Sequence, residues 1–283
     1  MISIIKDYEH KTKMKYSNSN PIGPGHWNAV SYRGNWINFY SDADFIYEYF
    51  TRQIIEKFKH KNRLTIVDFG GGDGILLHTI KQQLEENNFK VIAINLDLNK
   101  DNLKLCKKKY PEVIAKKWDI LRQYKKDFAD IIVSRFVLQY QNTPGQLELI
   151  KNANFSLKKS GLFLLMWVGN KNGKKFNAIM AKITGIIMNI AYRKALQTRN
   201  FPSKYSTKKL MASAGFKKIT AVKVDARGFL SANAWAERFN LNNKESNELK
   251  KKFYSYSKSN NLMTTIDGKL GYEFYIPFIA AEK

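Results

Sequence analysis

Several kinds of residue are scarce in this chain, and each scarcity excludes a class of protein. A single cysteine, Cys106, in 283 residues excludes a disulfide framework and a zinc site built on cysteines. No stretch reaches the roughly 18 uninterrupted apolar residues that would span a bilayer. The first residues mix acids and bases, unlike a signal peptide. We therefore expect a cytoplasmic protein without a membrane span or a metal site.

Arginine is also scarce, although the chain is strongly basic. The net charge of +24 comes from 48 basic residues, of which 9 are arginine, against 24 acidic residues. Arginine makes the bidentate contacts to bases and phosphates, and the lysines are spread along the whole chain. The charge therefore leaves two interpretations open, a solvated basic surface and an RNA-binding surface. The first is favoured, so nucleic acid is not the expected partner.

The most informative stretch is LTIVDFGGGDGILL, from Leu64 to Leu77. Its first apolar run predicts a buried strand, its glycines predict a tight turn, and the apolar run from Ile75 predicts a helix. Glycine permits backbone conformations that a Cβ forbids and lets a ligand lie against the chain. The dinucleotide motif G-x-G-x-x-G would require glycine at Ile75, so NAD binding is not predicted. A turn without a ligand is the second interpretation.

Strands and helices alternate after this turn. The apolar segment GLFLLMWV is typical of a strand in a sheet that helices cover on both faces. Pro277 lies inside the last expected strand, which indicates an edge position or a bulge. The alternation predicts an α/β fold with a doubly wound sheet. After the strand at Leu64, the expected strands are Lys90–Asp97, Val113–Ile120, Ala129–Ser134, Gly161–Val168, Phe216–Val224 and Gly271–Ala280.

The spacing Asp68-x-Gly70-x-Gly72-x-Gly74 resembles the nucleotide-binding motif of class I (Rossmann-like) S-adenosylmethionine-dependent methyltransferases. The resemblance continues with an acid at the end of the second strand, Asp97, and with an acid after the third. It implies a seven-stranded, mostly parallel sheet whose seventh strand is antiparallel, with helices on both faces. It also implies S-adenosylmethionine as cofactor and S-adenosylhomocysteine as product.

The resemblance also implies a donor site, residue by residue. The glycine turn would lie under the amino-acid part of S-adenosylmethionine, and the acid ending the second strand would accept charge-assisted hydrogen bonds from the ribose hydroxyls. The acid and the apolar residue after the third strand would flank the adenine. The end of the fourth strand would flank the sulfonium or the carboxylate. The expected cofactor-binding residues are Asp68, Gly70, Gly71, Gly72, Gly74, Asp97, Leu98, Asp119, Ile120, Ser134 and Arg135.

The acceptor side is less constrained. Among the four histidines, His26 lies amid aromatic residues and is the candidate general base, with a structural role as the alternative. RNA-modifying relatives often have Asn/Asp-Pro-Pro-Phe/Tyr after the fourth strand. This chain has Ser134-Arg135-Phe136-Val137 there, which disfavours methylation of nucleobase amines. The candidate walls of the acceptor pocket are Trp27, Tyr32, Tyr40, Gln139, Tyr140 and Trp167.

The expected organisation is an N-terminal arm and aromatic lid over 1–60, followed by a methyltransferase domain over 61–283. Helical cap insertions are expected at about 170–205 and 229–260. Apolar residues within 176–190 recur with helical spacing, which suits a pocket cap, a dimer contact or a membrane-surface helix. We expect a monomer or homodimer that methylates a small molecule, an apolar or aromatic secondary metabolite of natural product biosynthesis. The alternatives are an RNA or protein methyltransferase, or an S-adenosylmethionine-binding cyclase that transfers no methyl group.

Overall fold

A computed structural model describes residues 44–168, 200–221, 226–233, 236, 241–259, 263–266 and 269–283. The expected N-terminal lid and the expected helix within 176–190 lie outside these residues. So do His26, Trp27, Tyr32 and Tyr40.

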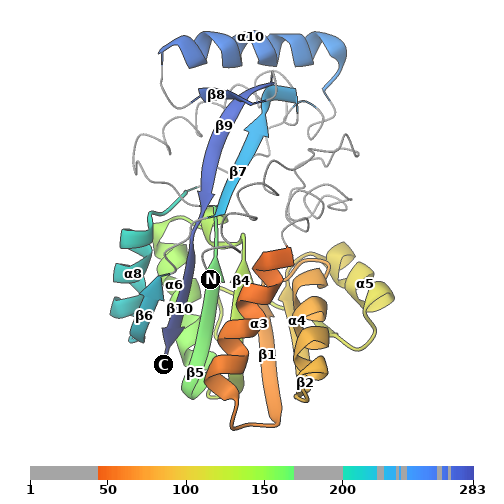
Figure 1. Ribbon diagram of the computed structural model, residues 1–283, viewed down its shortest axis with the longest axis vertical. Coiled ribbons are helices and arrows are strands. Elements are labelled where there is room, and N and C mark those ends of the chain that lie inside the picture. The colour runs from red at the N-terminus through yellow and green to blue at the C-terminus, as the bar shows by residue number, and fades with distance from the viewer. Residues whose placement is uncertain are drawn as a thin grey trace, which may run out of the picture.

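The central sheet has seven strands in the order β3-β2-β1-β4-β5-β10-β6 (Figure 1). Neighbouring strands are parallel except at β10, which runs antiparallel to both β5 and β6. This confirms the predicted class I methyltransferase topology, a mostly parallel sheet with a reversed final strand. The bounds are β1 (Arg63–Phe69), β2 (Lys90–Asp97), β3 (Ile114–Lys117), β4 (Ala129–Arg135), β5 (Leu157–Met166), β6 (Lys217–Ala221) and β10 (Phe278–Glu282).

Helices cover both faces of this sheet, as predicted. The side chain of Asn99 caps the helix Lys100–Lys109 by accepting hydrogen bonds from two backbone N–H groups of its first turn. Asn142 and Ser203 cap the helices Thr143–Ser156 and Lys204–Ser213, and each accepts one backbone N–H. One face carries α3 (Asp44–Phe58), α4 (Ile75–Glu86) and α5 (Lys100–Lys109), and the other carries α6 (Thr143–Ser156) and α8 (Lys204–Ser213).

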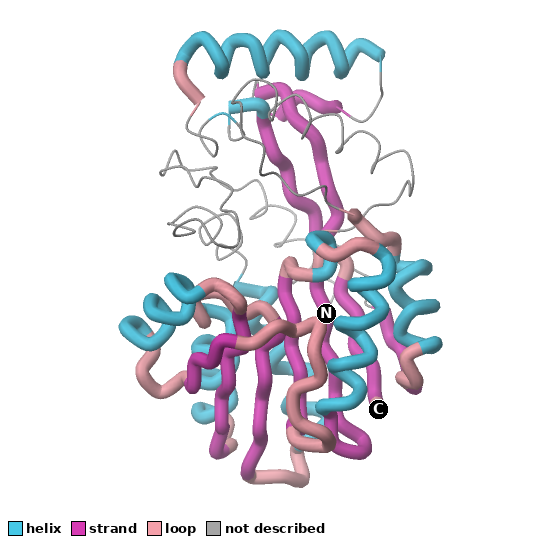
Figure 2. Tube along the Cα trace, turned by 180° about the vertical axis from the view of Figure 1, so that it is seen from behind, coloured by secondary structure: helices cyan, strands magenta, loops and turns pink. Residues whose placement is uncertain are grey.

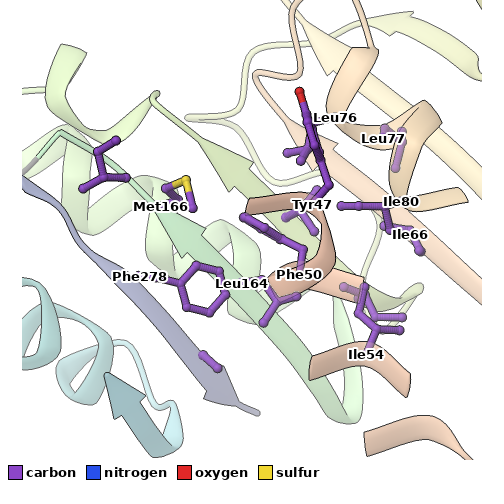
Figure 3. Packing of buried hydrophobic residues seen from close by; sticks show 14 of the residues in the cluster. Tyr47, Phe50, Ile54, Ile66, Leu76, Leu77, Ile80, Leu164, Met166 and Phe278 are labelled. Atoms are coloured by element: carbon purple, nitrogen blue, oxygen red, sulfur yellow. The ribbon is translucent and has the colours of Figure 1, made fainter. Parts of the chain in front are cut away.

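The alternation of strand side chains produces two core layers. In β1, Leu64 and Ile66 pack toward α3 and α4, whereas Val67 and Phe69 pack on the opposite face. Figure 3 shows Phe50 of α3 among apolar side chains of the sheet and of α4. Phe50 is fully buried, and burial of such a side chain stabilises the fold by about 1.5–3 kcal/mol. Helix α3 is therefore an integral part of the core.

A second, three-stranded antiparallel sheet stands above the carboxyl ends of the parallel strands (Figure 1). We call this sheet together with α10 the cap. Leu249 and Phe253 of α10 are fully buried in the same apolar cluster as Ile276 and Phe278, so cap and central sheet share a core. The cap consists of β7 (Ala226–Ser231), α10 (Asn243–Ser259), β8 (Met263–Ile266) and β9 (Lys269–Ile276).

The cap and the central sheet are joined by one two-stranded ribbon, which Figure 2 shows from behind. In the sheet, Ala221 of β6 pairs with Ile279 of β10, and just beyond them Ala226 of β7 pairs with Ile276 of β9. Pro277 separates β9 from β10. Because proline has no N–H to donate to a ladder, the pairing is interrupted there.

The structure corrects several predicted boundaries. The strand expected over 271–280 is two strands, β9 and β10, in different sheets. The insertion expected to be helical at about 229–260 is helical only in part, because it begins within β7 and α10 starts at Asn243. The third strand ends at Lys117 instead of Ile120, and the fifth begins at Leu157 instead of Gly161. Among the described residues, no helix combines the length and apolarity that crossing a bilayer requires.

Candidate cofactor-binding site

Four polar side chains lie on one face of the sheet near the carboxyl ends of β1, β2 and β4. Asp68 of β1 pairs in register with Asn95 of β2 on one side and with Val133 of β4 on the other. Because side chains two residues apart share a face, Asp97 lies beside Asn95, and Arg135 lies beyond Val133. All four therefore share the face covered by α3, α4 and α5.

Asp68 is the most unusual of these side chains. It is fully buried, and neither of its carboxylate oxygens has a hydrogen-bond partner among the described residues. Burial raises the pKa of Asp68 to about 7, although the positive charge of Arg135 acts in the opposite direction. A buried polar group without a partner is costly. A cationic ligand group next to Asp68 would remove that cost.

The glycine turn lies directly against this carboxylate. Gly70 has a φ of 75° and donates its N–H to the Leu96 carbonyl at 2.7 Å. A Cβ on Gly71 would lie 2.5 Å from both Asp68 Oδ2 and Asn95 Oδ1, which no real side chain could tolerate. A Cβ on Gly70 would lie 2.6 Å from Val137. The turn thus needs glycine for close approach as well as for backbone conformation.

Asp97 holds the turn onto the end of β2. Its two oxygens accept backbone N–H groups, Oδ2 from Gly72 and Oδ1 from Asn99, each at 2.8 Å. Burial raises the pKa of Asp97, while these backbone N–H groups act to lower it. Asp97 therefore has a structural role in the turn, alongside any role toward a ligand.

Asn95 is a site residue that the sequence analysis missed. Its Nδ2 donates to the Gly72 carbonyl at 2.9 Å, and its buried Oδ1 has no partner among the described residues. The sequence contains a signal that could have identified it, because Asn95 is the one polar residue inside the apolar part of the strand KVIAINLD. It also lies two residues before Asp97 and therefore on the same face.

The other expected donor-site residues follow these strands. Leu98, directly after β2, is 45% exposed for a large apolar side chain. The Trp118 N–H donates to the Asp97 carbonyl at 3.0 Å, which places the Asp119 loop next to the end of β2. The Asp119 carboxylate accepts a hydrogen bond from the Leu121 backbone N–H, and the Ile120 side chain is buried. Ser134 points to the opposite face, where its hydroxyl donates to the Phe69 carbonyl at 2.9 Å.

Gly74 completes the turn at the start of α4. It has a φ of 85°, and a Cβ there would collide with the Cys106 sulfur. Cys106 is fully buried, and burial raises the pKa of its thiol. Cys106 is therefore a neutral thiol that packs under the turn.

The structure places the described acceptor-side candidates in different surroundings. Trp167 is fully buried in the α6–α8 core, and its indole N–H donates to the Pro202 carbonyl at 2.8 Å. It is therefore a core residue and not a pocket wall. Gln139 is buried in the short 3-10 helix η1 (Leu138–Tyr140), and its Nε2 donates to the Phe136 carbonyl. Tyr140 is half-buried at the end of the same helix.

Arg135 ends β4 in a defined position. Its Nη1 donates to the Tyr47 hydroxyl at 3.1 Å, and its guanidinium carbon lies 5.4 Å from the Tyr47 ring centroid. In the described part of the chain, no carboxylate lies within ion-pair distance of Arg135. Tyr47 comes from α3, is 4% exposed and belongs to the cluster in Figure 3.

Comparison with known proteins agrees with this geometry. Residues 27–221 match the model of a family described as a methyltransferase domain. The match covers more than half of the chain, which therefore belongs to the S-adenosylmethionine-dependent methyltransferase family. The cofactor of this class of enzyme is S-adenosylmethionine. No curated protein shows significant similarity to the sequence.

Solved structures share the fold at low sequence identity. A Bacillus halodurans protein assigned as a methyltransferase is 16% identical with a TM-score of 0.63, covering 83% of this chain and 97% of its own. The YcgJ protein of Bacillus subtilis is 12% identical with a TM-score of 0.60, and the match covers 83% of this chain and 98% of the YcgJ chain. An S-adenosylmethionine-dependent methyltransferase from Archaeoglobus fulgidus is 14% identical with a TM-score of 0.50, covering 89% and 100%.

The residues present fit this cofactor. S-adenosylmethionine carries an α-ammonium group, and the buried Asp68 carboxylate has the opposite charge and no hydrogen-bond partner among the described residues. The glycine turn leaves no room for side chains where the chain approaches that carboxylate.

Proposed function

We propose that this methyltransferase moves the methyl group of S-adenosylmethionine to an O, N or C atom of a small, apolar or aromatic molecule. The observation that supports the donor site best is Asp68, a fully buried carboxylate whose oxygens have no partner among the described residues. A carboxylate in that state is stabilised by a cationic ligand group. The ammonium of the donor's amino-acid part supplies such a group.

In this proposal each polar residue of the site holds one part of the donor. Asp68 accepts from the α-ammonium, and the glycine turn lies under the amino-acid part. Asp97, which already accepts the N–H groups of Gly72 and Asn99, also accepts from the ribose. A carboxylate has about four lone-pair sites, so both roles are compatible. Leu98, Asp119 and Ile120 flank the adenine.

The cap supports a small-molecule acceptor. It stands over the carboxyl ends of the strands (Figure 1), and the region between Ala221 and β10 lies beyond the family match at 27–221. An enclosed site suits methyl transfer, because the methyl group is already activated on a sulfonium and the protein must orient the acceptor and exclude water. His26 is the proposed general base where the acceptor is an alcohol or an ammonium.

Calorimetric titration tests the donor site directly. We expect S-adenosylmethionine and S-adenosylhomocysteine to bind at micromolar strength, and NAD not to bind. Asp97→Ala should weaken S-adenosylhomocysteine about 10- to 100-fold, because hydrogen bonds to a charged group contribute about 1.5–3 kcal/mol. Asp101→Ala, an exposed acid on α5, is the control. No binding of either sulfur ligand would refute the proposal.

A second titration tests the acceptor class. Because the net charge is +24, an RNA methyltransferase would bind RNA with an affinity that falls steeply as salt rises. We expect only weak RNA binding that S-adenosylhomocysteine does not change. Release of S-adenosylhomocysteine should instead depend on a small acceptor. Tight donor binding without methyl transfer to any acceptor would favour a cyclase or another reaction that transfers no methyl group.

A further inference from the structure

Arg135 lies between the donor site and the cap along the carboxyl edge of the sheet. The strand order places β2 and β1, which carry Asp97 and Asp68, on one side of β4, and β5 and β10 on the other. Arg135 pairs in register with Met166 of β5, which in turn pairs with Phe278 at the start of β10. The ribbon to the cap rises from β10. Neighbouring strands are about 5 Å apart, so β4 lies about 10 Å from β2.

The chain around Arg135 fixes its direction. Phe136, the next residue, has a φ of 57°, an uncommon conformation for a bulky side chain. Two hydrogen bonds hold Phe136 there. The Phe136 N–H donates to the Met166 carbonyl at 2.8 Å, and the Phe136 carbonyl accepts from Gln139 Nε2 at 2.8 Å. On the other side, the Tyr47 hydroxyl accepts from Arg135 Nη1 at 3.1 Å. Strain kept in place by its surroundings is typical of functional sites.

Among the described residues, Arg135 has no carboxylate within ion-pair distance. It is half-buried, and its Nη1 donates a hydrogen bond to a neutral phenol, that of Tyr47. Asp68 is the anion that it influences. In the proposed function the donor's ammonium pairs with Asp68, and the sulfonium adds another positive charge. An anion from a ligand would then compensate Arg135.

We propose that Arg135, positioned by Tyr47, binds an anionic group, a carboxylate or phosphate, on the methyl acceptor. This inference rests on the proposed function and narrows its substrate class to anionic small molecules. Arginine suits the role because its planar guanidinium offers paired donors to such groups. The donor's own carboxylate has the same chemistry, so the experiment must distinguish the two sources.

The experiment uses the full chain saturated with S-adenosylhomocysteine, and calorimetry with benzoate, phenyl phosphate and the neutral benzamide as probes. We expect at least one anion to bind more tightly than benzamide. Arg135→Gln should weaken that anion about 10- to 100-fold, the range for hydrogen bonds to a charged group, and change S-adenosylhomocysteine affinity less than threefold. Tyr47→Phe, which keeps the ring, should weaken the anion by a smaller factor. Arg63→Gln, exposed at the opposite edge, should change neither.

Two results would overturn the assignment. If Arg135→Gln weakens S-adenosylhomocysteine as strongly as it weakens the anions, Arg135 binds the donor's carboxylate. If no anion binds the wild-type complex more tightly than benzamide, the acceptor is not selected by charge. Failure of the wild-type protein to bind S-adenosylhomocysteine at all is a different result, because it refutes the proposed function itself.

Discussion

The buried carboxylate of Asp68 should make the ligand-free protein less stable as the pH rises. The pKa of Asp68 is about 7 in the folded chain against an ordinary value of 3.8, and burial is the main cause. The folded state therefore retains a proton that the unfolded state has lost between these two values. The contribution of Asp68 to the free energy of unfolding is therefore greatest below about pH 4, falls through the window, and is constant above about pH 7.

The magnitude follows from the shift. At about 1.4 kcal/mol per pKa unit, the difference between 3.8 and about 7 corresponds to about 4 kcal/mol of folding free energy lost across the window. In Asp68→Asn the new amide is neutral at every pH, so the pH-dependent contribution of Asp68 to the free energy of unfolding is lost. The free energy of unfolding of the variant, relative to wild type, should therefore rise by about 1.4 kcal/mol for each pH unit between about 4 and about 7.

Urea unfolding without ligand, at several pH values from 4 to 8, measures this difference. Any effect of the new amide that does not depend on pH cancels in the comparison. A flat difference for Asp68→Asn would refute the reasoning, since it would mean that Asp68 is ionised in the folded protein at every pH tested.

Three further substitutions test other parts of the structure. Gly71→Ala should destabilise the chain by about 1–3 kcal/mol and abolish S-adenosylhomocysteine binding in calorimetry, because its Cβ would lie 2.5 Å from Asp68. Gly72→Ala strains a backbone with a φ of 56° but meets no atom closer than 3.8 Å, so it should retain more of this binding than Gly71→Ala does. Trp167→Phe should lose about 1–3 kcal/mol in urea unfolding and leave that affinity unchanged; a large loss of affinity would restore Trp167 to the site. Asp130→Asn should cost about 1.5–3 kcal/mol at pH 7, because hydrogen bonds from Lys61, Lys158 and a backbone N–H outweigh burial and lower the Asp130 pKa. That stability is present above pH 3.8 and is lost as the pH falls through the lowered pKa, so a cost that does not decrease as the pH falls would contradict it.

The central sheet and the polar residues at the carboxyl ends of its strands could be predicted from the sequence. Apolar runs and a glycine turn are local signals, and they located β1, β2, β4 and the start of α4 within a few residues. The position of Asp68 and Asp97 at the ends of two strands followed from the same signals. Their shared face followed only once the register Asp68–Asn95 was known, because register is a property of two segments.

The cap could not be predicted in the same way. Its strands β7 and β8 are separated by α10, so the pairing of β7 with β9 depends on contacts distant in sequence. Pro277 looked like a bulge in one strand, although it divides two sheets. Trp167 was a predicted pocket wall within the expected strand Gly161–Val168. Its burial among the residues of α6 and α8 depends on packing that the local sequence does not specify.

The ribbon between sheet and cap has a consequence for how this enzyme could diverge. The chain leaves the central sheet after Ala221 and returns at Phe278, and these two points lie almost opposite each other on neighbouring strands. The whole intervening segment is thus an insertion into a single hairpin. Recombination could exchange or resize that segment without moving β1, β2 or β4. A single recombination event could in this way change the set of acceptor substrates, while the donor site on β1, β2 and β4 stays unchanged and under separate selection.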